Sequence, residues 1–64
     1  MDPEATARIM QDRAAGSADR IGAARNLLRW LDRGGFAPFG WTRTEARRIC
    51  NQMIADATNK QAWA

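Results

Sequence analysis

The sequence predicts a small all-α domain of three helices, with an aromatic loop containing Gly and Pro between the second and third helices. Apolar residues recur at helical spacing in three segments, and residues typical of helix starts and stops flank each segment. No segment shows the alternating pattern of a β-strand. We expect helices at about 3–15, 18–33 and 43–58, which together make a domain over 1–58, followed by a polar tail at 59–64.

The first helix has a strong start and a thin apolar face. Asp2 suits the capping position and Pro3 the first helical position, and Glu4 faces the positive end of the helix dipole. Gly16 suits the end of this helix. The expected apolar face consists of Ile9, Met10 and Ala14.

The second helix is predicted to be the central one, because its apolar face is wide enough to contact two neighbours. Ser17 is the expected N-cap, and the Gly34-Gly35 pair is the expected stop, since glycine adopts the left-handed conformation without steric cost. The apolar face comprises Ile21, Ala23, Ala24, Leu27, Leu28, Trp30 and Leu31.

The third helix begins with a capping box, in which Thr42 is the N-cap and Glu45 lies three residues later. Its apolar residues have the cleanest helical period in the chain: Ala46, Ile49, Cys50, Met53, Ile54 and Ala57. The preceding segment holds Phe36, Phe39 and Trp41, which is too apolar for a solvated linker. We therefore expect this aromatic loop to fold over the open end of the helices and join the core. An exposed recognition loop is the alternative.

Composition excludes several classes of function. A chain of 64 residues is too short to enclose a large pocket, and it contains no histidine and one cysteine. We expect no catalytic residues, no metal site, no cofactor and no internal disulfide, with Cys50 in the core. There is no apolar run of membrane-spanning length and no signal-peptide pattern at the start. These features favour an intracellular, cytoplasmic, non-enzymatic binding module without membrane contact.

The best candidate surface is a row of arginines on the second helix. Arg25, Arg29 and Arg33 recur every four residues, opposite the leucines, and Asp32 is the one acid close to them in the helical pattern. The row is about 12 Å long, at 1.5 Å per residue, and can follow a phosphate backbone. The alternative is an ordinary solvated helix face whose arginine stems cover apolar surface.

The third helix supplies further candidate contacts on its outward face. Arginine and asparagine side chains make bidentate contacts with guanine and adenine edges. The connection from Gly34 to Trp41 is longer than the turn of a helix-turn-helix motif, so the arrangement is not a standard motif of that kind. Such residues are also common on ordinary surface helices. The candidates are Arg43, Arg47, Arg48 and Asn51.

The charge is modest, at +3 from ten basic and seven acidic residues, but its placement favours nucleic acid, and DNA first, as the partner. The sequence leaves open whether the role is regulatory and whether the chain self-associates. An adaptor, inhibitor or assembly subunit that binds an acidic protein surface is the competing hypothesis. Trp63 is then the candidate partner anchor, with packing against the first helix as its alternative role.

Overall fold

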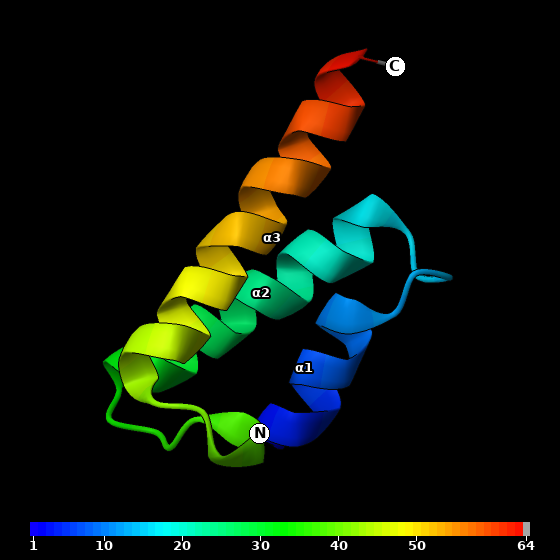
Figure 1. Ribbon diagram of the computed structural model, residues 1–64. Helices are drawn as coiled ribbons and strands as arrows, with labels where there is room; N and C mark the ends of the chain where they lie inside the picture. Colours follow the sequence, from blue (N-terminus) through cyan, green and yellow to red (C-terminus); the bar gives the residue numbers. More distant parts are fainter. Residues whose placement is uncertain (64) are drawn as a thin grey trace.

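A computed structural model describes the backbone of residues 1–63 and the side chains of residues 1–58. It contains three α-helices, α1 (Pro3–Gln11), α2 (Ser17–Asp32) and α3 (Arg43–Trp63), and a 3-10 turn, η1 (Pro38–Gly40), before α3 (Figure 1). No strand occurs in the described part of the chain. The predicted all-α three-helix fold is confirmed.

Helix α1 starts as predicted but ends earlier and buries a different face. The Asp2 carboxylate accepts hydrogen bonds from the amides of Glu4 and Ala5, at 3.0 and 3.3 Å. The helix stops at Gln11 because Asp12 leaves the helical conformation and its side chain accepts from the Ala14 amide at 2.9 Å. The predicted face of Ile9, Met10 and Ala14 is therefore wrong in two of its three positions: the buried residues are Pro3, Ala7 and Met10, and Ile9 and Ala14 are exposed.

Helix α2 lies between the other two helices and packs against both, in agreement with its wide apolar face (Figure 1). The predicted N-cap was one residue late: Gly16 occupies that position and Ser17 is already helical. No side chain caps the start of α2. Its first turn is joined to α1, since Arg20 Nε donates to the Met10 carbonyl at 3.0 Å. The fully buried positions of α2 are Ala24, Leu27 and Leu31, and Ala23 is nearly so.

The end of α2 is a Schellman motif, as the glycine pair suggests. Gly34 has φ of +91°, and its amide donates to Leu31, while the Gly35 amide donates to the Trp30 carbonyl at 2.9 Å. Gly35 also lies against the indole of Trp30, because a Cβ at this position would be 2.3 Å from the ring. The two glycines thus have different tasks: Gly34 supplies the left-handed turn, and Gly35 leaves room for Trp30.

The aromatic loop closes the end of the bundle only in part. Pro38 is buried and Trp41 half-buried, and η1 contacts α1, but Phe36 is 69% exposed and Phe39 41% exposed. The expectation that the whole loop joins the core is therefore wrong for the two phenylalanines. Phe36 and Phe39 form edge-to-face ring pairs with Trp30 and Trp41, at centroid distances of 5.8 and 5.3 Å.

Helix α3 begins with the predicted capping box and runs longer than predicted. The Glu45 amide donates to Thr42 Oγ1 at 3.0 Å, and the Thr42 amide donates to Glu45 Oε1 at 3.4 Å. The sequence predicts an end near residue 58, whereas the helix extends to Trp63. Residues 59–62 contain neither glycine nor proline, so nothing in the sequence stops the helix there.

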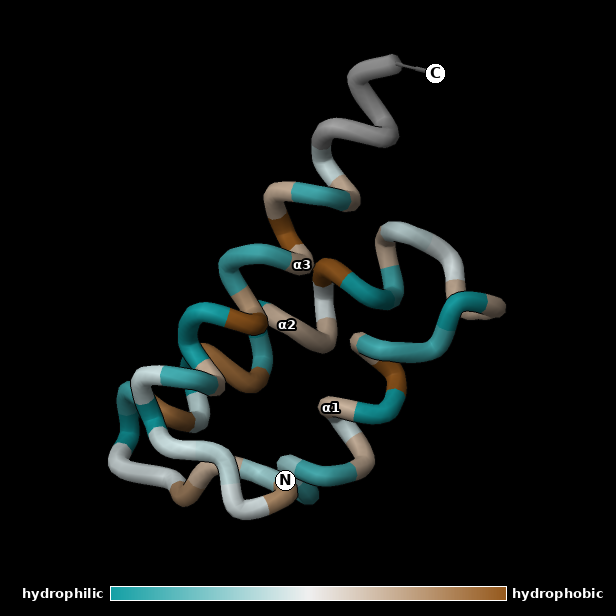
Figure 2. The backbone as a smooth tube through the Cα atoms, in the orientation of Figure 1, coloured by the Kyte–Doolittle hydropathy of each residue, from teal (hydrophilic) through white to brown (hydrophobic). Residues whose placement is uncertain are grey.

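The core forms where α2 meets the other two helices. It contains Met10 of α1, Leu27 and Leu31 of α2, and Ala46 and Cys50 of α3, all fully buried. Figure 2 shows hydrophobic positions recurring at intervals among hydrophilic ones along the coloured part of the helices, as expected of helices with one buried face. Burial also raises the pKa of the Cys50 thiol, which keeps it protonated and agrees with a packing role.

Candidate nucleic-acid interface

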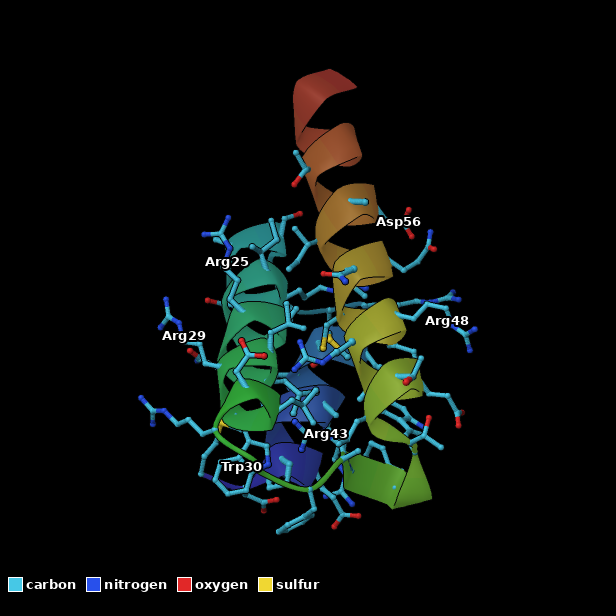
Figure 3. All side chains as sticks on the ribbon, turned by 90° about the vertical axis from the view of Figure 1, so that its left-hand side faces the viewer. Arg25, Arg29, Trp30, Arg43, Arg48 and Asp56 are labelled. Carbon is cyan, nitrogen blue, oxygen red and sulfur yellow. The ribbon has the colours of Figure 1, made fainter. Side chains whose placement is uncertain are left out.

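Three exposed arginines form a ridge along the side of α2, and we call Arg25, Arg29 and Arg33 the arginine ridge. Figure 3 shows Arg25 and Arg29 projecting from α2 away from α3. Within the described residues, none of the three forms an ion pair or a side-chain hydrogen bond. Their guanidinium groups therefore keep all their donors for an external partner, and the structure places them on one exposed helix face as the spacing predicts.

Asp32, the acid nearest to the ridge in the helical pattern, is engaged elsewhere. Its carboxylate pairs with Arg47 Nη2 of α3 at 2.5 Å, across the α2–α3 contact. The two side chains are 63% and 42% exposed, so the pair adds little to stability. Its consequence is electrostatic: Asp32 neutralises Arg47 rather than Arg29, so Arg29 keeps its full charge and Arg47 is less available to a phosphate.

Arg43 is the most firmly held of the predicted contact residues. Its guanidinium donates to the Gly35 carbonyl at 3.1 Å and to the Leu31 carbonyl. Leu31 lies in the last turn of α2 and Gly35 lies just after the helix, where the helix dipole favours a cation. Arg43 therefore joins the start of α3 to the end of α2.

Replacing Arg43 with alanine is expected to lower the free energy of unfolding by about 1.5–3 kcal/mol, because two hydrogen bonds from a charged donor are lost. Arg43→Lys should recover only part of the loss, since a point charge cannot reach both carbonyls with the geometry of a planar fork. Urea denaturation followed by circular dichroism measures the change. Arg48→Ala removes the same charge from an exposed position and should stay within about 0.5 kcal/mol of the wild type. Equal losses for the two alanine variants would contradict the capping role.

The remaining predicted residues do not extend the ridge into one continuous basic surface. Arg48 and Asn51 are exposed on α3. Figure 3 shows Arg48 on the opposite side of the molecule from Arg25 and Arg29. Arg48 lines a separate shallow groove with Gln11 of α1. The side chain of Trp63, the candidate partner anchor, lies outside the described residues.

A small hollow of about 170 Å³ opens beside the ridge. Its walls combine donors with apolar surface, and they come from Met1, Asn26, Arg29, Trp30 and Arg33. The sequence assigned Trp30 to the apolar face of α2, so its part in this hollow was not predicted. The signal was nevertheless there: Asn26, Arg29, Trp30 and Arg33 follow the i, i+3, i+4, i+7 spacing of one helix side.

Two other acids line a different hollow. Asp12 and Asp19 line a larger opening of about 550 Å³ between α1 and α2. Two carboxylates there repel a phosphate, whereas the hollow beside the ridge has two arginines and no acid among its walls. The two hollows thus differ in charge: the larger is lined by two acids and the smaller by two arginines.

The described residues contain no cluster of three or more side chains suited to hold a metal ion. None of the helices, over the same residues, combines the length and apolarity needed to cross a bilayer. Neither protein-family models, nor curated proteins, nor solved structures give a match to the chain.

Proposed function

We propose that this protein is a small non-enzymatic module that binds nucleic acid, DNA in particular, through the arginine ridge of α2. One observation carries this proposal: among the described residues, the three arginines are exposed on one helix face and have no acidic partner. An uncompensated row of this kind attracts a polyanion and releases its counterions on contact.

Arginine is suited to this task because its planar fork binds two phosphate oxygens at once. The three arginines follow one another at steps of about 6 Å along the helix axis, four residues at 1.5 Å each. They can therefore contact more than one phosphate of the same backbone. Phosphate contacts position a protein without reading sequence, so the ridge by itself supports affinity rather than specificity.

The double variant Arg25→Ala/Arg29→Ala tests the ridge. Fluorescence anisotropy with a labelled DNA oligonucleotide, titrated at several salt concentrations, gives the slope of log affinity against log salt. We expect weaker binding and a slope that is smaller by about one unit per lost phosphate contact. Circular dichroism should show unchanged helicity, because neither side chain contributes a described contact.

The matched control is Arg13→Ala/Arg48→Ala, which lowers the net charge by the same amount at two exposed positions away from the ridge. This control should keep most of the wild-type slope. An unchanged slope in the ridge variant, or an equal loss in the control, would refute binding through the ridge. The second result would indicate that net charge alone drives association.

An acidic protein surface is the second candidate partner of the same ridge. The exposed phenylalanines favour it, because Phe36 and Phe39 offer apolar surface of the kind found at protein interfaces. Polyglutamate as a competitor separates the two hypotheses. If nucleic acid is the partner, the labelled DNA should stay bound in an excess of polyglutamate. If polyglutamate displaces the DNA when both supply the same number of negative charges, the acidic protein surface is favoured.

A further inference from the structure

We propose that the hollow beside Trp30 receives one unpaired base of a single-stranded nucleic acid whose backbone lies on the arginine ridge. This base site rests on the proposed nucleic-acid binding and adds to it the kind of strand that is bound. Its walls are named above: Met1 and Trp30 are apolar, while Asn26, Arg29 and Arg33 carry donors.

The composition of the walls suits a base better than a phosphate alone. A phosphate needs donors around it and gains nothing from an indole or a thioether. A base has an apolar ring face and a polar edge, and it stacks on aromatic rings and on guanidinium planes. Asn26 adds an amide that both donates and accepts, which matches the edge of a base.

Trp30 is held in place before any ligand binds. Its Nε1 donates to the Phe36 carbonyl at 2.9 Å, Gly35 lies against the indole, and the Phe36 ring meets it edge-on at 5.8 Å. A wall that is already fixed costs little conformational entropy on binding. The glycine pair and the aromatic loop thus position the ring that a base would contact.

The ridge and the hollow share residues, which places a backbone and a base side by side. Arg29 and Arg33 belong to both, whereas Arg25 lies outside the hollow. A strand on the ridge can therefore put its phosphates on the arginines and turn one base toward Trp30. In a duplex the base faces are covered by stacking, so a duplex can use the ridge but not the hollow.

Three labelled DNA probes of equal length distinguish these contacts: a single strand, the same strand with abasic sites in place of its bases, and the corresponding duplex. We expect the intact single strand to bind about tenfold more tightly than either other probe, the size of effect that stacking of one base provides. Asn26→Ala should reduce this preference and leave the abasic affinity unchanged. Arg25→Ala should weaken all three probes alike, because it removes a phosphate contact alone.

Indole fluorescence gives a second measurement that does not depend on changing Trp30. In the variant Trp41→Phe/Trp63→Phe, Trp30 is the one remaining indole. The intact strand should quench its emission on binding, and the abasic strand should not. If all three probes bind with equal affinity, and Arg25→Ala weakens each of them, binding through the ridge is supported and the base site is refuted. If no probe binds, both the nucleic-acid function and the base site are refuted.

Discussion

Replacing Leu27 with alanine is expected to lower the free energy of unfolding by about 2–5 kcal/mol. Leu27 is fully buried on the helix that packs against both neighbours, so the lost methyl groups leave a cavity that neither α1 nor α3 can fill alone. Small domains have about 0.05–0.15 kcal/mol of stability per residue, so the loss removes a large part of the total. Urea denaturation followed by circular dichroism measures it.

Ile9→Ala is the matched control for this core substitution. It also shortens an aliphatic side chain to a methyl group, but Ile9 is 47% exposed on α1 and alanine favours the helix. The expected change is below about 1 kcal/mol. Similar losses at Leu27 and Ile9 would contradict the observed orientation of α1 and the central place of α2.

Replacing Gly35 with alanine should be nearly as damaging, although the substitution adds only one methyl group. The new Cβ would lie 2.3–2.5 Å from three atoms of the Trp30 indole, so the ring must move. Overpacking of this kind costs about 1–3 kcal/mol. Moving the ring also breaks its hydrogen bond to the Phe36 carbonyl, which adds about 1 kcal/mol.

Gly22→Ala is expected to change stability in the opposite direction. Gly22 lies inside α2, and a Cβ there meets nothing within 4 Å. Alanine in a helix interior is favoured over glycine by about 0.5–1 kcal/mol. The melting temperature of Gly22→Ala should therefore lie above that of the wild type, and the melting temperature of Gly35→Ala should lie below it. A neutral Gly35→Ala would show that Trp30 is not packed against this backbone.

Local chemistry made the helix ends at three places predictable. The Asp2 cap, the capping box of Thr42 and Glu45, and the glycine stop after α2 all involve residues within a few positions of each other. Hydrogen bonds of this range depend little on the rest of the fold. The wrong cap of α2 shows the limit, because Gly16 and Ser17 are both acceptable at that position.

The buried face of α1 was not predictable from hydrophobicity. Ile9 is the more apolar residue, yet the helix turns Ala7 toward the core and leaves Ile9 exposed. A short helix with few apolar residues can be rotated at little cost, so its neighbours decide which face is buried. Contacts such as the bond from Arg20 to the Met10 carbonyl contribute to that choice.

The candidate interface likewise combines one feature that the sequence predicts with contacts that form only when the helices pack. Helical spacing alone aligned Arg25, Arg29 and Arg33, and the structure keeps them together on one exposed face. The spacing gave no sign that Arg43 would cap α2 or that Arg47 would pair with Asp32. Both contacts join residues of α3 to the end of α2, so they exist only once the helices are packed.

The sequence by itself determined the helical class, the starts of α1 and α3, the glycine stop after α2 and the arginine row, because each follows from the period of a helix or from a bond between near neighbours. The tertiary structure alone decided which arginines remain available. When α3 packs against α2, Arg43 bonds to the carbonyl of Gly35 and Arg47 pairs with Asp32, so Asp32 does not neutralise the ridge. The fold of the aromatic loop also holds the ring of Trp30, which helical spacing places beside Arg29 and Arg33. The charge balance depends on contacts between α2 and α3, and the ring position depends on how the loop after α2 folds back, so neither follows from helical spacing.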